Sequence, residues 1–198
     1  IVAVLDRAKE IRALPDWGTL EIADVGTGSG AIAITLARHA QPCRVTAIEI
    51  CPAALDVAKT NAERLGVADA IEWWQSDLFS EVPADRKYHL VVSNPPYVAE
   101  DEFDSLPIDV RDHEPRIALV SGPRGIEVIE RLVAMAADRL QPGGWFLCEI
   151  GPRIAVAAKE CFATTQNWEA VACQRDLAGH PRVIEARRTG EVDGAVPA

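Results

Sequence analysis

The stretch LEIADVGTGSGAIAITLARHA, residues 20–40, decides how this chain folds. It begins with a mostly apolar run over residues 20–25, which is typical of a strand buried in a parallel sheet. Glycines at alternate positions follow over residues 26–30, and residues 31–40 carry the pattern of a helix. Strand, glycine turn and helix in this order predict the first unit of an open α/β sheet, in which a ligand lies beyond the carboxyl ends of the strands.

The alternation of strand and helix continues along the rest of the chain. Further helices are predicted over residues 1–14, 53–65, 125–140 and 154–162, and further strands over residues 43–49, 70–77, 88–94, 145–151, 168–174 and 182–187. Residues 98–121 have weak periodicity and are predicted as a long loop, and the Pro-Gly-Gly at residues 142–144 is predicted to turn the chain into the next strand. The whole pattern predicts a single domain, residues 1–198, built on a doubly wound, mostly parallel seven-stranded α/β sheet.

The size and composition of the chain narrow the classes of protein to which it can belong. Its 198 residues suit one domain, and 48% hydrophobic with 25% charged residues is a globular composition. No apolar run approaches the ~20 residues that cross a bilayer, and no signal sequence is recognisable, so we expect a cytoplasmic protein without a membrane partner. A net charge of −10 repels phosphate backbones and no block of Lys and Arg offsets it, so a nucleic-acid partner is not expected.

The five cysteines, Cys43, Cys51, Cys148, Cys161 and Cys173, are odd in number and contain no C-x-x-C pair. This spacing predicts neither a disulfide framework nor a zinc site. The histidines have no companions at ligand spacing, so no metal is assigned. Apolar thiols buried in a reducing compartment are the expected state of all five cysteines.

The glycine turn offers a binding surface for a ligand that carries a nucleoside. Gly26 and Gly28 can adopt backbone angles closed to other residues and let a ligand approach the main chain, while Gly30 permits close packing of helix on sheet. With Gly30 the spacing fits G-x-G-x-G, common in S-adenosylmethionine enzymes, and with Ala31 it fits G-x-G-x-x-A, a dinucleotide pattern, so both cofactors remain open here. The residues of the turn predicted to bind the cofactor are Gly26, Thr27, Gly28, Ser29 and Gly30.

Residues at the ends of the next two strands are predicted to contact the same cofactor. Glu49 ends the second strand about 20 residues after the glycines, where a carboxylate accepts hydrogen bonds from ribose hydroxyls. Asp77 and Leu78 follow the third strand, where an acid or a main-chain amide can contact an adenine base. Leu78 and Phe79 are predicted to flank the ring of that base.

The fourth strand ends in Ser-Asn-Pro-Pro-Tyr, residues 93–97, and its two prolines forbid continuation as strand or helix. In a doubly wound sheet this strand neighbours the first one, so Asn94 is expected to face the reactive end of the cofactor. The side-chain carbonyl of Asn94 and the backbone carbonyl of Pro95 can both accept hydrogen bonds from one NH2 group. Pro96 keeps the turn rigid, and Tyr97 can lie flat against a planar amide or base.

This arrangement suits methylation of a planar NH2 nitrogen, which is a poor nucleophile because its lone pair is delocalised. Two acceptors that hold both hydrogens fix the plane of the nitrogen, aim it at the methyl carbon and stabilise the positive charge that develops on it. Such positioning can lower the barrier by ~7–11 kcal/mol. Asn94, Pro95 and Tyr97 are therefore the predicted catalytic residues.

With both turns in view, the chain resembles the class I S-adenosylmethionine-dependent methyltransferases, which have a Rossmann-like sheet. More narrowly, it resembles the HemK (PrmC) family of protein-(glutamine-N5) methyltransferases over residues 19–187. The shared segments are DVGTGSGAIAI, SDLF, VVSNPPY, HEPRIALVSG, GIEVIERL, LQPGGWFLCEIG and RDLAGHPRV. Asn-Pro-Pro-Tyr also occurs in adenine amino-methyltransferases, whereas Glu114-Pro115 followed by a glycine-rich turn is more specific to the glutamine family.

The resemblance implies a reaction and a partner. It implies methyl transfer from S-adenosylmethionine, with S-adenosylhomocysteine as product, to the glutamine side chain in the Gly-Gly-Gln motif of peptide chain release factors. It also implies that Leu78 and Asn94 contact the cofactor together with the glycine turn and Glu49, and that residues 94–97 and Glu114 hold the glutamine. Family members carry an N-terminal helical domain, which is expected to be absent from this chain.

Three other functions are weighed against this one. Methylation of adenine amino groups in DNA or RNA predicts a basic cleft and salt-sensitive binding of nucleic acid. A nicotinamide-dependent oxidoreductase leaves residues 94–97 without a role. The third alternative is a non-enzymatic protein that binds S-adenosylmethionine. Methyl transfer to a release factor would distinguish the expected function from all three alternatives.

Overall fold

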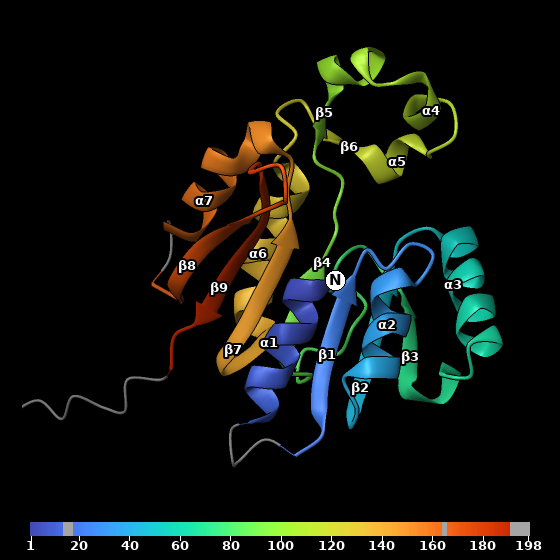
Figure 1. Ribbon diagram of the computed structural model, residues 1–198, viewed down its shortest axis with the longest axis vertical. Helices are drawn as coiled ribbons and strands as arrows, with labels where there is room; N and C mark the ends of the chain where they lie inside the picture. Colours follow the sequence, from blue (N-terminus) through green and yellow to red (C-terminus); the bar gives the residue numbers. More distant parts are fainter. Residues whose placement is uncertain (14–17, 164–165, 191–198) are drawn as a thin grey trace, which may run out of the picture.

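The computed structural model describes residues 1–13, 18–163 and 166–190 (Figure 1). Its helices are α1 (Val2–Arg12), α2 (Ala31–His39), α3 (Pro52–Arg64), α4 (Ile108–Arg111), α5 (Arg116–Leu119), α6 (Glu127–Arg139) and α7 (Ala155–Ala163), with short 3-10 helices η1 (Ala68–Ala70), η2 (Glu100–Ser105) and η3 (Pro152–Ile154). Its strands are β1 (Leu20–Val25), β2 (Cys43–Glu49), β3 (Ile71–Gln75), β4 (Tyr88–Ser93), β5 (Val98–Ala99), β6 (Val120–Gly122), β7 (Leu140–Glu149), β8 (Trp168–Arg175) and β9 (Pro181–Arg188). The helix predicted over residues 1–14 is α1, and residue 14 lies outside the described residues. Among the helices in these ranges, none combines the length and the apolar character that a membrane crossing requires.

Seven strands form one sheet in the order β3-β2-β1-β4-β7-β9-β8. The neighbours from β3 to β7 pair in parallel, and β9 runs antiparallel to both β7 and β8. This confirms the predicted doubly wound, mostly parallel seven-stranded sheet. The chain builds outward from β1 to β3 and returns to β4 on the other side of β1, so the strand order reverses between β1 and β4. Ligands of such sheets bind at this reversal, beyond the carboxyl ends of the strands.

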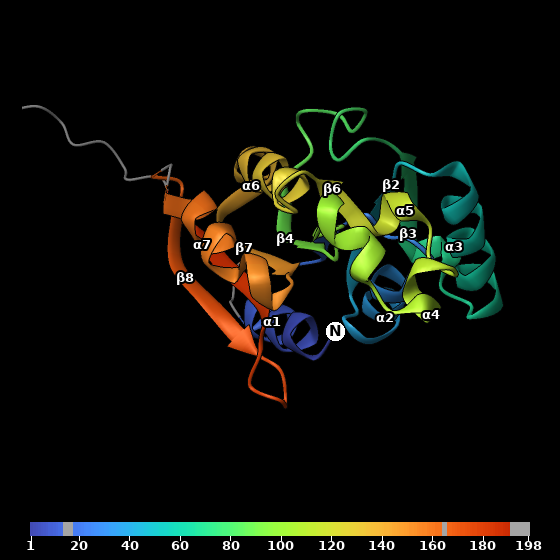
Figure 2. The same cartoon turned by 90° about the horizontal axis from the view of Figure 1, so that it is seen from above.

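Helices cover both faces of the sheet, and Figure 2 shows α6 on one side with α1 and α2 on the other. Buried side chains of α1, α2 and α3 form one apolar cluster with the sheet, and those of α6 and α7 form a second cluster on the opposite face. The helix predicted over residues 125–140 is confirmed as α6, and its side chains Ile129, Leu132, Val133 and Ala136 form a buried apolar stripe. Each larger side chain of this stripe contributes about 1.5–3 kcal/mol by leaving water. The central strands of the sheet are thereby held between two layers of helices.

Residues 98–122, here called the cap segment, form short elements where the sequence predicts a long loop. β5 and β6 pair in parallel as a separate two-stranded sheet, and η2, α4 and α5 lie between them along the chain. In Figure 1 the cap segment, green to yellow, stands above the tips of the strand arrows. The loop prediction is wrong because β5, with 2 residues, and even η2, with 6, are too short to show a strand or helix period.

The Pro-Gly-Gly at residues 142–144 lies inside β7, and the predicted turn before the strand is wrong. β7 begins at Leu140, directly after α6, and its register against β4 shifts there, with Tyr88 opposite Leu140 and Leu90 opposite Trp145. The additional residues on β7 form an irregularity of the kind that glycines accommodate inside strands. β7 thus starts earlier than predicted and still brings its apolar run into the centre of the sheet.

The cysteines differ in burial, and the prediction of five buried thiols holds for only two. Cys43 and Cys148 are buried, Cys51 and Cys161 are partly buried, and Cys173 is exposed. Burial raises the pKa of Cys43 to about 11 and raises that of Cys148 as well, so both thiols stay protonated at neutral pH. Cys173 escapes burial because it lies on β8, the last strand of the sheet.

Candidate functional site

A cavity of about 870 Å³ lies between the carboxyl ends of the central strands and the cap segment. Such a volume is typical of sites for small ligands and cofactors. Most of the site residues predicted from the sequence line it, namely Gly26, Thr27, Gly28, Ser29, Glu49, Asp77, Leu78, Asn94, Pro95, Pro96, Tyr97 and Glu114. The sheet brings them together because β1, β2, β3 and β4 are parallel and end at the same edge.

The glycine turn after β1 has a backbone that few residues other than glycine adopt. Gly26 and Gly28 have φ of +71° and +57°, in the left-handed region. The amides of Gly26 and Thr27 both donate to the carbonyl oxygen of Ile48, at 2.8 and 3.0 Å, which fixes the turn beside the end of β2. A β-carbon at either glycine would have no described atom within 4 Å, so the space above the turn is open to a ligand.

Gly30 is placed among the cofactor residues by the sequence, but it does not line the cavity. It is buried just before α2, and a β-carbon there would lie 2.9 Å from Cδ1 of Ile34 and 3.1 Å from Cβ of Ala58. Because Ala58 belongs to α3, Gly30 lets α2 and α3 approach each other. The sequence predicted that Gly30 permits close packing of helix on sheet, and the structure shows instead that it permits close packing of helix on helix.

Asp24, the residue before the last of β1, anchors the glycine turn, and sequence reasoning did not single it out. Its Oδ2 atom accepts hydrogen bonds from Oγ1 of Thr27, at 2.6 Å, and from the backbone amide of Ala33, at 2.9 Å. Its Oδ1 atom is buried and has no hydrogen-bond partner among the described residues. Burial raises the pKa of Asp24 to about 6, and the nearby charge of Glu49 adds to the effect. An acid within a buried strand, directly before a glycine turn, is the sequence signal that identifies it.

Glu49 ties the glycine turn to the start of α3. Its Oε2 atom accepts a hydrogen bond from the amide of Gly28, and its Oε1 atom accepts one from the amide of Cys51, both at 2.9 Å. The side chain is buried at the edge of the cavity. Because each carboxylate oxygen has a second lone pair, Glu49 can hold these amides and still accept hydrogen bonds from a ligand.

The turn after β3 brings Asp77 and Leu78 to the cavity but not Phe79. Asp77 forms an ion pair with Arg131 of α6, at 2.7 Å, and Arg131 lines the cavity too. Leu78 has φ of +51°, a conformation that costs of order 1–3 kcal/mol outside glycine. Phe79 is fully buried, with its ring centroid 6.0 Å from that of Tyr88. The prediction that Phe79 flanks the base is wrong, because its side chain belongs to the core.

The Asn-Pro-Pro-Tyr turn lies beside the glycine turn, as predicted for neighbouring strands. Ser93 at the end of β4 pairs with Val25 at the end of β1, and the Ser93 hydroxyl donates to the Val25 carbonyl at 2.7 Å. The Asn94 side chain is exposed to the cavity and makes no hydrogen bond within the described ranges. Ser93 was not singled out from the sequence, although it fastens the two turns to each other.

Tyr97 is packed from two directions. A β-carbon at Gly151, just beyond β7, would lie 3.0 Å from Cδ2 of the Tyr97 ring. A β-carbon at Gly125 would lie 2.8 Å from the Tyr97 carbonyl oxygen, so the turn before α6 packs on the backbone of the same residue. Burial and the charge of Glu149 raise the pKa of the Tyr97 phenol, and Arg182 partly offsets them. Tyr97 is therefore packed on both its ring and its backbone.

The cap segment closes the cavity from above with mostly apolar side chains. Its lining residues are Val98, Leu106, Val110, Glu114, Pro115, Ile117, Ala118, Leu119 and Val120. Glu114 brings a carboxylate to this wall, which is compatible with the predicted contact to a substrate. An apolar wall with few polar groups excludes water and leaves orientation to those groups.

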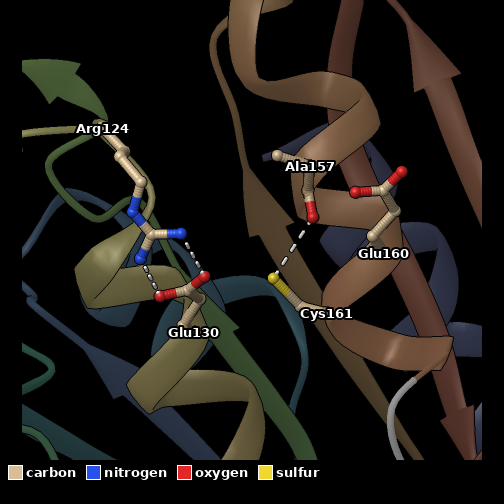
Figure 3. A pocket seen from close by; sticks show the side chains of 5 residues that line it. All are labelled: Arg124, Glu130, Ala157, Glu160 and Cys161. Carbon is tan, nitrogen blue, oxygen red and sulfur yellow. Dashed lines mark hydrogen bonds and ion pairs between the residues drawn. The ribbon is translucent and has the colours of Figure 1, made fainter.

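A second cavity, of about 370 Å³, lies between α6 and α7 (Figure 3). The guanidinium of Arg124 binds both carboxylate oxygens of Glu130, at 3.0 and 2.6 Å, and the Cys161 thiol donates to the carbonyl oxygen of Ala157 at 3.3 Å. Burial and the charge of Glu130 raise the pKa of Cys161, which disfavours the reactive thiolate. Most polar groups of this cavity bind one another, and the larger cavity contains the predicted site residues, so the larger cavity is the candidate site.

A family model described as methyltransferase small domain matches residues 6–107 of the chain. The match is just over half of the 198 residues. It runs from α1 through the glycine turn and the Asn-Pro-Pro-Tyr turn into the cap segment. The family match therefore contains both turns that form the cavity floor.

Curated relatives are similar over nearly the whole chain. A release factor glutamine methyltransferase of Rhodopirellula baltica is 38% identical over 188 residues, covering 95% of this chain and 63% of the relative. One of Koribacter versatilis is 43% identical over 189 residues, with the same shares covered. The chain thus spans less than two thirds of the length of these relatives. The solved ribosomal protein L11 methylase of Lactobacillus delbrueckii subsp. bulgaricus has a TM-score of 0.64 at 19% identity, covering 94% of this chain and 79% of its own, which shows a shared fold.

Proposed function

The chain belongs to the methyltransferase small domain family, and from this premise we propose that it methylates a glutamine side-chain amide, using S-adenosylmethionine as the methyl donor. The glutamine we propose is that of the Gly-Gly-Gln motif in peptide chain release factors. The names of relatives that match 95% of the chain support this substrate. The proposed location is the cytoplasm, where release factors act in translation termination.

The residues of the large cavity fit S-adenosylmethionine. The open space above Gly26 and Gly28 suits the close approach of an amino-acid chain to the backbone. Glu49 keeps acceptor positions for ribose hydroxyls next to that turn. Ile50 lines the cavity and is a large apolar side chain left 46% exposed, and with Leu78 it offers two apolar surfaces for an adenine ring.

S-adenosylmethionine supplies, when bound, a methyl group on a positively charged sulfur. The residues of this chain hold the accepting nitrogen in place. The side-chain carbonyl of Asn94 and the backbone carbonyl of Pro95 accept the two N–H hydrogens of the glutamine amide, which fixes its plane and stabilises positive charge on nitrogen. The Tyr97 ring limits rotation of the amide, and the cap segment excludes water. A base is not required before transfer, because the amide nitrogen is neutral and releases a proton afterwards.

One observation supports this function more than any other. Asn94, with a side chain that bonds to no described residue, stands at the end of β4 beside the open glycine turn at the end of β1, and both line one cavity. A side chain that only closed a turn would use its carbonyl within that turn. The amide of Asn94 is instead left available to a ligand next to the proposed cofactor position.

The substrate can be tested by incubating the chain with labelled S-adenosylmethionine and one acceptor at a time. The acceptors are an intact release factor, its variant with the Gly-Gly-Gln glutamine replaced by alanine, duplex DNA and structured RNA. We expect label on the intact release factor alone, and mass spectrometry should place one added methyl group on the glutamine. Label on nucleic acid without label on the release factor would replace this function by adenine methylation.

Glu49→Ala is expected to weaken the binding of S-adenosylmethionine by roughly 1–2 kcal/mol, because ribose hydroxyls lose a charged acceptor. Isothermal titration calorimetry measures the change. Glu49→Gln keeps the volume and one acceptor oxygen and should lose less affinity, although its NH2 group then faces the amide of Gly28 or Cys51. Glu63→Ala, at an exposed position on α3, is the matched control. Wild-type affinity in Glu49→Ala would rule out the contact with ribose.

A further inference from the structure

Gly151 is a buried residue just beyond β7, and it faces the ring of Tyr97. A β-carbon at position 151 would lie 3.0 Å from Cδ2, 3.3 Å from Cε2 and 3.9 Å from Cγ of Tyr97. Apart from the neighbouring residues of the chain, these three atoms of one side chain are the nearest to it. The Tyr97 ring therefore occupies the space that any other residue at position 151 would need.

The backbone of Gly151 does not itself require a glycine. Its φ of −78° and ψ of 149° lie in the extended region, which residues of every kind adopt. The turn after β1 is different, because Gly26 and Gly28 have positive φ. The close approach of the Tyr97 ring is thus the reason for a glycine at position 151, and the conformation of the chain is not.

Gly151 is held on both sides along the chain. The preceding residue, Ile150, is fully buried, and its amide donates to the carbonyl oxygen of Arg182 on β9 at 2.9 Å. On the other side Ile154 is buried, and its amide donates to the carbonyl oxygen of Gly151 at 3.3 Å. A side chain added at position 151 could not move the chain away from Tyr97 without disturbing these contacts.

The backbone of Tyr97 is confined as well. Pro95 and Pro96 precede it with restricted φ, and Val98, which follows it, pairs with β6. A β-carbon at Gly125 would lie 2.8 Å from the Tyr97 carbonyl oxygen, so the turn before α6 packs closely on this backbone. The ring is therefore the part that a larger residue at position 151 would displace. Because Tyr97 lines the cavity, its displacement changes the wall where the glutamine amide is proposed to lie.

We propose that Gly151 is a positioning residue for methyl transfer: the absence of a side chain at position 151 sets the place of the Tyr97 ring, which limits rotation of the glutamine amide. The proposal rests on the proposed function, because that function gives the ring this task. Gly151 does not itself line the cavity, so it acts through Tyr97 and contacts neither substrate nor cofactor.

Gly151→Ala adds a single methyl group against the ring and is expected to lower kcat for a release factor. A misplacement of 1 Å can cost about 10²-fold in rate, so a shift of a few tenths of an ångström should lower kcat roughly ten-fold. The affinity for S-adenosylmethionine should stay at the wild-type value, as calorimetry would show. Single-turnover kinetics measure the transfer step, and a wild-type rate in Gly151→Ala would refute the proposal.

A double-mutant cycle tests whether Gly151 acts through the ring. Tyr97→Ala removes the ring, so Gly151→Ala should lower kcat no further when both substitutions are combined. Losses that multiply in the double variant would overturn the proposal, because Gly151 would then affect the reaction by another route. A purely structural role of Gly151 predicts this multiplication.

The place of the ring can also be followed without any substrate, because Tyr88 and Tyr97 are the two tyrosines of the sequence. Tyrosine labelled with carbon-13 in the ring gives separate nuclear magnetic resonance signals for the two residues, and Tyr97→Phe identifies those of Tyr97. Gly151→Ala should shift the Tyr97 signals and leave those of Tyr88 in place. Unchanged Tyr97 signals would contradict the proposal, even where Tyr97→Ala fails to fold.

Gly144→Ala is the matched control, because Gly144 is a glycine of β7 that is crowded by backbone and not by Tyr97. A β-carbon there would lie 2.9 Å from the carbonyl oxygen of Gln141 and 3.1 Å from that of His89. We expect Gly144→Ala to lower the unfolding midpoint and to leave the Tyr97 signals unchanged. An equal shift of these signals would overturn the proposal, since any crowding of β7 would then suffice.

The two readouts separate this proposal from the proposed function. Shifted Tyr97 signals with a wild-type kcat in Gly151→Ala would overturn the positioning role. A wild-type chain that methylates no release factor would overturn the proposed function, while the Tyr97 signals of Gly151→Ala would still decide whether residue 151 sets the place of the ring.

Discussion

Asn94→Ala is expected to lower the rate of methyl transfer to a release factor by about 10²- to 10³-fold, the range found when one preorganised hydrogen-bonding group is removed from an active site. The alanine removes one of the two carbonyl acceptors that fix the plane of the glutamine amide. Pro95 alone then leaves one N–H hydrogen without a partner and lets the nitrogen rotate away from the methyl carbon. Binding of S-adenosylmethionine should stay within a few-fold of wild type, because the glycine turn and Glu49 are untouched.

Single-turnover kinetics with labelled S-adenosylmethionine measure the transfer step, and calorimetry measures the affinity. Asn167→Ala is the matched control, since Asn167 is half-buried near the start of β8 and does not line the cavity. Asn94→Asp tests charge separately, because the carboxylate keeps an acceptor at the same place. Turnover of Asn94→Ala at the wild-type rate would exclude the proposed role of the amide.

The long elements of the fold could be predicted from the sequence because each carries a full period of apolar residues. β1 over Leu20–Val25 and α6 over Glu127–Arg139 are examples, and the predicted boundaries of β1 are those of the structure. The cap segment could not be predicted in this way, since its strands and helices are held by contacts across the segment. Val98 pairs with Val120, a residue 22 positions away, and such a pairing leaves no local pattern.

The candidate site, too, could be predicted from the sequence only in part. The glycine turn and residues 94–97 could be placed at one edge of the sheet, because their own composition ends a strand and parallel strands end together. The contacts that fix these turns come from residues far along the chain. Arg131 reaches Asp77 across 54 positions, and Gly151 receives the Tyr97 ring across the same number. A single sequence gives no sign of which distant residues meet.

The burial of Asp24 leads to an expected dependence of stability on pH. The folded pKa of about 6 lies above the ordinary value of 3.8, so the unfolded chain loses this proton first as the pH rises. Below about pH 3.8 Asp24 is protonated in both the folded and the unfolded chain, and its burial then has no effect on the pH dependence of the free energy of unfolding. Between pH 3.8 and about pH 6 Asp24 lowers the free energy of unfolding by up to about 3 kcal/mol, and the free energy of unfolding stays lowered by this amount at higher pH.

Asp24→Asn is therefore expected to raise the free energy of unfolding by about 1–3 kcal/mol at pH 8 and to leave it nearly unchanged at pH 4. The asparagine oxygen can accept the two hydrogen bonds from Thr27 and Ala33 that Oδ2 of Asp24 accepts, while its NH2 group replaces the unpartnered Oδ1 atom. Urea unfolding at the two pH values measures the difference, with Asp85→Asn, at an exposed position, as control. Equal destabilisation of Asp24→Asn at both pH values would mean that the carboxylate is needed for the turn itself.

Under the proposed function the more stable variant should also bind S-adenosylmethionine more weakly, because it removes a buried negative charge beneath a site for a cation.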